Sequence, residues 1–261
     1  MTDEKNKRID EVSRYYRSAA RLEFLVAGLF WVNALLSLII LFSEGLPVLW
    51  RESLPILFIL TVLVQFVASQ VNRFYLIPRA EQLRRKQMLS DSFGAPLSHD
   101  KTELYYNNSY SPSIKRLGAN TMENAFFSSE VAGEMLISKR AMVVLYMVLW
   151  VFLFSFRDTG LGVMIWITQI VFSGEIIAQW LSLEILRSRQ ERTYERLHTC
   201  FLHKIGSDSA KGIATILDSF VSYETAKSSS SCLLSSKVFH KLNPSLTRKW
   251  EQIRKDLGMD F

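Results

Sequence analysis

The sequence has few of the features that mark secreted proteins, metalloproteins and enzymes. It contains only two cysteines, Cys200 and Cys232. Both fall on the side that the charge distribution assigns to the cytoplasm, so we expect no disulfide bond. His198, Cys200 and His203 lie close in sequence, but no fourth ligand follows at a recognisable spacing, and we expect no metal site.

Catalytic motifs are also missing from the chain. We find no P-loop, no nucleophile elbow and no pair of carboxylates spaced for acid–base chemistry. The sequence therefore does not predict an enzyme, and no cofactor is indicated.

Charge is nearly missing from four runs, and this is the strongest signal in the sequence. The runs are 24–42, 54–71, 141–156 and 160–181. Each is about long enough to cross roughly 30 Å of hydrocarbon as a helix. Core helices of soluble proteins usually keep a polar stripe and are shorter. We predict an all-α membrane protein with four transmembrane helices arranged as two hairpins.

The basic residues predict the orientation of these helices. Of 31 lysines and arginines, 29 lie outside the two short connections 43–53 and 157–159. The positive-inside rule places that side in the cytoplasm, together with both termini. The cytoplasmic portion then carries a net charge of +8, which suits anionic lipid, nucleotide or nucleic acid, although proximity to lipid alone explains much of it. A mostly polar stretch of 23 residues precedes the first run, so we expect no cleavable signal peptide.

The hydropathy pattern divides the chain into five segments. They are a cytoplasmic N-terminal helix (1–21), a first transmembrane hairpin (22–76), a cytoplasmic insert (77–140), a second hairpin (141–186) and a cytoplasmic C-terminal helical region (187–261). We expect the N-terminus, the insert and the C-terminal region to form one helical cytoplasmic domain.

Shorter patterns predict the helices of that domain. Ile9, Val12, Tyr16 and Ala19 recur at helical spacing and predict an amphipathic helix leading into the membrane. Leu246, Trp250, Ile253 and Leu257 form a second apolar stripe, which Gly258 would end. A further helix is expected at 209–225, and the serine tract after it is typical of a linker or a mobile loop.

A polar stripe interrupts the fourth run. Thr168, Glu175, Gln179 and Ser182 share one face of a helix, and no lysine or arginine occurs within any run to neutralise Glu175. Because an unpaired charge at bilayer depth is costly, we favour a hydrated path beside Glu175. Four helices cannot enclose a channel and bury its walls, so a pore would need several subunits in a closed ring.

The first two runs carry weaker polar positions, Asn33 and Gln65. They could face the same path, or they could form hydrogen bonds between helices. Their spacing leaves both interpretations open.

Basic, aromatic and amide residues gather in the insert. They are Arg84, Arg85, Lys86, Tyr105, Tyr106, Asn107, Asn108, Lys115 and Arg116. Basic groups neutralise phosphates, rings stack on bases and amides read base edges, so this mixture fits a nucleotide or a short single strand. A solvated basic face with tyrosines packed in the core is the alternative, and composition alone favours it.

Three segments between the hairpins carry a resemblance to a known family. They read RAEQLRRKQMLSDSFGAPL, ELYYNN and RLGANTMENAFFSSEVAGEM. The chain, over roughly residues 10–205, resembles the four-transmembrane pore-forming effectors encoded beside nucleotidyltransferases in bacterial antiphage systems, and within that group it is most similar to the Hailong type.

The resemblance implies a function and a set of partners. It implies a homo-oligomeric channel of the bacterial inner membrane, for which we expect a tetramer. A single-stranded DNA oligomer, made by the neighbouring nucleotidyltransferase, would hold the channel closed, and opening would depolarise the membrane. The nine insert residues become plausible ligand contacts, while Arg187, Arg189, Arg192 and Arg196 could couple ligand occupancy to the stripe of Glu175.

Two alternatives stay open. The first is an effector opened by a cyclic nucleotide. The second is a non-conducting membrane scaffold that recruits a soluble protein.

Overall fold

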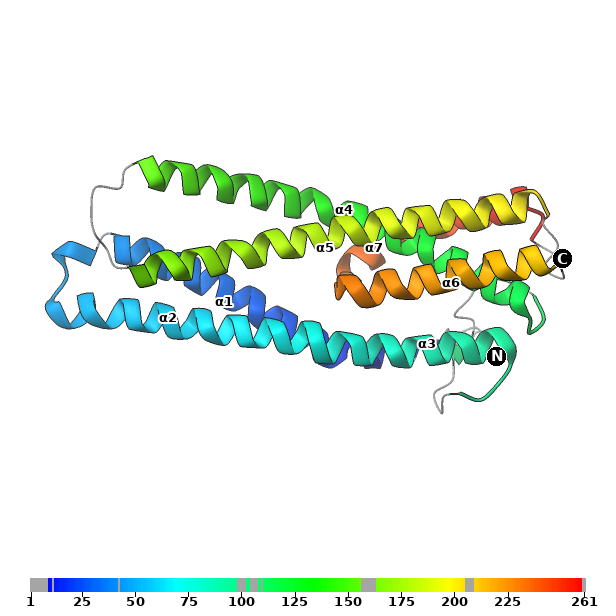
Figure 1. Ribbon diagram of the computed structural model, residues 1–261, viewed down its shortest axis with the longest axis horizontal. Coiled ribbons are helices and arrows are strands. Elements are labelled where there is room, and N and C mark those ends of the chain that lie inside the picture. The colour runs from blue at the N-terminus through cyan, green and yellow to red at the C-terminus, as the bar shows by residue number, and fades with distance from the viewer. Residues whose placement is uncertain are drawn as a thin grey trace, which may run out of the picture.

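The protein is an elongated bundle of helices in a computed structural model (Figure 1), which describes residues 9–10, 12–41, 43–97, 102–103, 108, 110–155, 163–204 and 209–259. The turn between the first two helices lies at one end of the long axis. The later helices α6 and α7 lie toward the opposite end, where α6 lies beside α3. Apart from one two-residue strand pairing, the regular structure described is helical, as the sequence predicts.

The first hairpin consists of α1 (Arg17–Leu41) and α2 (Val48–Val71), joined by the short 3-10 helix η2 (Ser43–Gly45). The chain does not break after α2. It passes through the π-helix η3 (Asn72–Leu76) directly into α3 (Ile77–Phe93). Pro78 has no backbone N–H to give to the helical ladder, and a local π-helical turn is one way to accommodate that loss.

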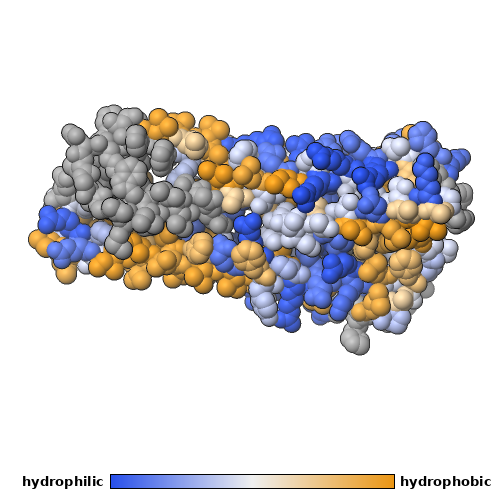
Figure 2. Space-filling view, in the orientation of Figure 1, coloured by the Kyte–Doolittle hydropathy of each residue, from blue (hydrophilic) through white to orange (hydrophobic). Residues whose placement is uncertain are grey.

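The first hairpin presents apolar side chains to its surroundings. Phe24 is 83% exposed and Trp31 is 66% exposed. Two helical stretches, Arg14–Ile40 and Val48–Phe93, are long and apolar enough to cross a membrane, and only 17% and 22% of their most apolar windows are buried. A core helix of a soluble protein would be mostly buried. Figure 2 shows the resulting apolar surface along this half of the molecule.

Two longer helices, α4 (Ile114–Ser155) and α5 (Val163–Leu202), pack along one another. They contain nearly all of the third and fourth apolar runs. Most side chains between 149 and 175 lie outside the described residues, so the four-helix membrane topology stays a prediction.

The remaining helices, α6 (Ala210–Ser230) and α7 (Ser236–Asp256), pack on the polar halves of α4 and α5. Serine side chains cap both, because Ser209 Oγ accepts a hydrogen bond from Gly212 N and Ser235 Oγ accepts one from Val238 N. The predicted stripe on α7 is confirmed: Leu246 and Trp250 are buried in the core, and Gly258 follows the helix with φ +61°.

Two segments differ from their predicted form. Ile9–Asp10 forms the short strand β1, which pairs antiparallel with β2 (Thr102–Glu103), and the 3-10 helix η1 (Val12–Tyr16) precedes α1. The insert therefore supplies a backbone partner that draws the N-terminal segment out of the expected helix. The serine tract is helical as far as Ser230, where its hydroxyls donate to carbonyls of the preceding turn, and only residues 231–235 form the predicted linker, between α6 and α7.

Candidate membrane–cytoplasm junction

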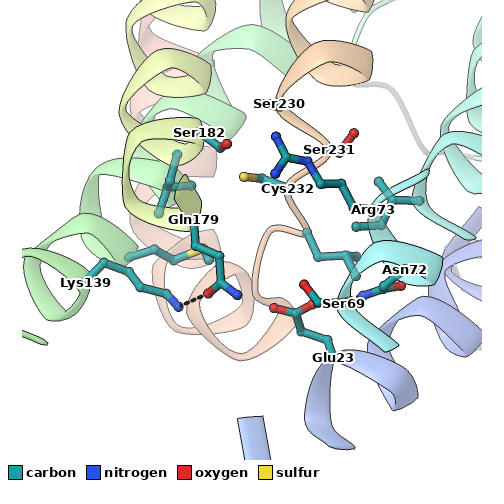
Figure 3. Close-up of a pocket in the computed structure, with 14 residues that line it drawn as sticks. Glu23, Ser69, Asn72, Arg73, Lys139, Gln179, Ser182, Ser230, Ser231 and Cys232 are labelled. Carbon is teal, nitrogen blue, oxygen red and sulfur yellow. Dashed lines mark hydrogen bonds between the residues drawn. The ribbon is translucent and has the colours of Figure 1, made fainter. Parts of the chain in front are cut away.

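A polar cavity of about 80 Å³ lies between the two hairpins and the segment after α6. Such a volume can hold a few water molecules. Figure 3 shows its labelled lining side chains directed toward one another from α1, α2, η3, α4, α5 and the end of α6. Gln179 and Ser182, two members of the predicted polar stripe, are among them.

The cavity marks the level at which the four apolar runs end. Glu23 immediately precedes the first run, and Asn72 immediately follows the second. Lys139 stands two residues before the third run, and Ser182 directly follows the fourth. Each of these side chains looks like an ordinary flanking residue in the sequence, and only the fold brings them together.

The polar contacts at the cavity join separate helices. Lys139 Nζ donates to Gln179 Oε1 at 3.1 Å, which links α4 to α5. Asn72 Nδ2 donates to Glu23 Oε2 at 2.9 Å, which links η3 to α1. Burial, followed by the nearby Glu23 carboxylate, raises the pKa of the Cys232 thiol to about 11, so this free cysteine stays protonated and unreactive at neutral pH.

Asn33 and Gln65 are buried against each other inside the first hairpin. Asn33 Nδ2 donates to Gln65 Oε1 at 2.7 Å, and Thr61 Oγ1 donates to Asn33 Oδ1 at 2.5 Å. The two residues are only 1% and 5% exposed. The structure therefore shows the interhelical hydrogen bonds that the sequence left as one of two interpretations.

The other two stripe residues, Thr168 and Glu175, lie on α5, but their side chains fall outside the described residues. Among the side chains that are placed, no group of three His, Cys, Asp or Glu residues could hold a metal ion.

Arg84, a predicted ligand contact, lies inside the protein. Its guanidinium donates to Glu81 Oε2 and to Glu224 Oε1, both at 2.7 Å, and stacks 5.2 Å from the centre of the Tyr223 ring. Lys227 Nζ donates to the other oxygen of Glu81 at 3.0 Å. This buried charge network of Glu81, Arg84, Glu224 and Lys227 ties α3 to α6, and Arg84 is 6% exposed.

The network sets the protonation of its members. Burial alone would raise the pKa of Glu81, but the Lys227 ammonium and the Arg84 guanidinium outweigh it and hold the pKa at about 2. Burial lowers the pKa of Lys227, and the Glu81 carboxylate more than compensates, so the net direction is upward. Glu81 and Lys227 are therefore both charged at neutral pH. Glu224 lies 140 positions from Arg84 in the sequence, so no local sequence pattern predicted that contact.

The other predicted ligand contacts that the structure describes lie on α3 and around the start of α4. Arg85 is half-buried and Lys86 exposed on α3. Arg116 forms a forked ion pair with Asp91, with contacts of 2.8 and 3.2 Å. The remaining predicted contacts are distributed as follows: Asn108 donates to buried Asn120, Lys115 Nζ lies 4.4 Å from the Tyr110 ring, and Tyr105, Tyr106 and Asn107 lie outside the described residues.

The polar latch of Asp91, Asn108, Arg116 and Asn120 joins the end of α3 to the start of α4. Asn120 Nδ2 donates to Asp91 Oδ2 and to Ser92 Oγ, both at 3.0 Å. In the described part of the insert, these contacts hold the connection between two helices rather than forming one open basic surface.

The four predicted coupling arginines contact neighbouring helices of the bundle or line a groove on it. Arg187 packs over Gly133 of α4, where an added Cβ would lie 3.3 Å from Arg187 Nε. Arg189 donates to Ser229 of α6 at 3.0 Å. Arg192 and Arg196 line a shallow groove between α5 and α6, and Arg196 also pairs with Asp218. All four thus lie along the polar half of α5.

The comparisons with protein-family models, curated proteins and solved structures give no significant match to this chain.

Proposed function

We propose that this protein is a homo-oligomeric ion channel of the bacterial inner membrane, gated through its cytoplasmic domain as an effector of antiphage defence. The observation that carries the proposal is the continuity of the helices. Val48–Phe93 runs without a break from exposed apolar surface into a buried charge network, and the continuous helix α5 passes the junction cavity.

Continuous helices give a ligand a mechanical route to the membrane. A ligand can open or close a channel only if it binds one conformation better than the other. In this protein, a displacement of α6 or α3 by a ligand would move α2 directly, because Arg84 and Lys227 bind those helices together. The single-stranded DNA oligomer remains the ligand implied by the family resemblance, with the neighbouring nucleotidyltransferase as its source.

The polar residues at the end of the fourth apolar run are suited to a role in ion conduction. Gln179 and Ser182 border the cavity, and Glu175 stands one helical turn deeper on α5. A ring of subunits would bring several copies of this stripe together around a hydrated path.

Membrane potential in cells expressing the chain tests this proposal. A voltage-sensitive dye would be read with and without the neighbouring nucleotidyltransferase, for the native protein, for Glu175→Gln and for Glu52→Gln as the control carboxylate in a connection. The proposal of a pore held closed by the neighbour's product is supported if cells depolarise only when the nucleotidyltransferase is absent. In that case Glu175→Gln should alter the depolarisation and Glu52→Gln should not. Depolarisation only with the neighbour favours opening by a messenger such as a cyclic nucleotide.

A non-conducting scaffold is the second candidate function. The exposed apolar side chains Ile213, Leu217 and Val221 lie along one face of α6 and suit a protein partner. Purified protein that gives no single-channel currents in planar bilayers under either condition, although inserted, would favour this scaffold.

A further inference from the structure

We propose that the junction cavity is a binding site for one phosphate group, with Arg73 as its principal cation. The group could belong to the headgroup of an anionic phospholipid or to a free phosphate of the cytosol, since the chemistry of recognition is the same. Figure 3 shows the Arg73 guanidinium extending into the cavity between Ser231, Cys232 and Ser182.

The charges at the cavity favour an anion. Arg73 and Lys139 contribute two positive charges, and Glu23 contributes one negative charge. The Glu23 carboxylate already accepts a hydrogen bond from Asn72, while Lys139 contacts an amide oxygen rather than a carboxylate. Among the described residues no carboxylate forms an ion pair with Arg73, whose guanidinium lies 5.8 Å from the centre of the Phe74 ring. One cation is therefore in excess, in a partly enclosed site.

The uncharged lining supplies one further donor. The Ser182 hydroxyl lines the same cavity, whereas the Ser230 and Ser231 hydroxyls donate to the carbonyls of Lys227 and Ser228. A guanidinium forms forked hydrogen bonds to two phosphate oxygens, and a hydroxyl group can donate to a third. Donors from η3, α4 and α5 would thus converge on a single tetrahedral anion.

The position of the cavity explains why a phosphate would be available. It lies where all four apolar runs end, which is the depth of the phospholipid headgroups if the runs cross the bilayer. This placement rests on the proposed membrane function. An occupied site would join η3 to α4 and α5, and would therefore stiffen the junction between the two hairpins.

Native mass spectrometry of the full-length protein would test the lipid source. The detergent-purified protein is incubated with mixed micelles of phosphatidylglycerol and phosphatidylcholine, and the lipids retained are counted. We expect preferential retention of phosphatidylglycerol, with affinity reduced about tenfold or more in Arg73→Gln and unchanged in Arg79→Gln, an exposed arginine on the same continuous helix. Lys139→Gln is the second variant and should weaken retention in the same direction.

Isothermal titration with inorganic phosphate tests the free source with the same proteins. Binding of phosphate that depends on Arg73, without preference for phosphatidylglycerol, supports the site and assigns it to a cytosolic phosphate. The inference is overturned if the native protein binds neither phosphatidylglycerol nor phosphate. It is also overturned if Arg73→Gln and Arg79→Gln retain the ligand equally. Neither readout uses conductance, so a conducting protein that binds no phosphate refutes only the site, and a phosphate-binding protein that never conducts refutes only the channel.

Discussion

Arg84 shows how a basic residue in a basic segment can be part of the core. Its guanidinium sits between two buried carboxylates, Glu81 and Glu224, at 2.7 Å from each. The two carboxylates hold the guanidinium in place, and the Lys227 ammonium binds the other oxygen of Glu81. A ligand phosphate would have to displace a carboxylate to reach it, so we expect Arg84 to hold α3 and α6 together.

Replacing Arg84 by glutamine should therefore destabilise the protein strongly. Loss of the cation leaves Glu224 without its partner in a buried site, and breaking a buried pair in this way costs about 3–5 kcal/mol. Thermal unfolding in detergent would measure the loss, with Lys86→Gln on the exposed side of α3 as the control. Equal unfolding temperatures for the two variants would show that the network contributes little.

Glu81 should make the stability of the protein depend on acid. Its folded pKa of about 2 lies below the usual 4.5 of a glutamate, because Lys227 and Arg84 outweigh the effect of burial. A carboxylate with a lowered pKa stabilises the fold fully above its unfolded pKa and loses that contribution as the pH falls through the folded pKa. The window is therefore pH 4.5 down to about 2, and the contribution is about 3 kcal/mol.

Comparison of Glu81→Gln with the native protein isolates this contribution. The difference in free energy of unfolding should be largest near neutral pH and should shrink between pH 4.5 and 2. The exposed Glu191 offers a control, since Glu191→Gln should leave the pH profile unchanged. A difference that stays constant down to pH 2 would contradict the lowered pKa of Glu81.

At the scale of helices, the first hairpin is held by amide contacts within an apolar surface. Asn33 of α1 and Gln65 of α2 bond directly, and Thr61 adds a third member. Interhelical hydrogen bonds in membranes contribute modestly, about 0.6 kcal/mol on average and up to about 1.7. The contact therefore fixes the register of the two helices more than it contributes to the free energy of folding.

A double-mutant cycle would measure this contact. Asn33→Ala combined with Gln65→Ala should show a coupling of about 0.6–1.7 kcal/mol in detergent unfolding, because either single change removes the same bond. The cycle of Asn33→Ala with Gln70→Ala, a second glutamine of α2, should be additive. Additive effects for Asn33 and Gln65 would place their amides elsewhere, for example toward a path between subunits.

Local sequence patterns predicted the helices better than they predicted the site. Charge-free runs and a four-residue spacing were enough to find α1, α2 and the buried stripe of α7, because both signals come from residues close in sequence. The buried ion pairs could not be predicted from sequence, since Arg84 and Glu224 meet only after α6 has packed on α3. Arg73 and Lys139 were likewise missed, because their convergence depends on two hairpins lying side by side.

The serine tract was misjudged for a related reason. Composition favours a linker for consecutive serines, and residues 231–235 do connect α6 to α7 without helix, yet α6 continues to Ser230, where Arg189 of α5 donates to Ser229. Tertiary packing here overrides a weak local preference.

Over the whole molecule, apolar and polar surface segregate along the long axis. Figure 2 shows apolar surface concentrated on the half that holds α1 and α2, and mostly hydrophilic surface on the other half. The buried charge network, the polar latch and the arginines of α5 lie in that second half. A molecule divided in this way would sit in a bilayer with its long axis across it. The turn Ser43–Gly45 would then face away from the cytoplasm.

Thiol labelling in intact cells would test that orientation. Starting from a chain carrying Cys200→Ala and Cys232→Ala, a cysteine at Glu44 should react with a membrane-impermeant maleimide, because the turn lies at the far end from the basic half. A cysteine at exposed Lys86 should react only after the cells are permeabilised, as the 29 basic residues on its side predict. Labelling of Lys86→Cys in intact cells would invert the topology, and protection of Glu44→Cys until permeabilisation would place the whole chain inside the cell.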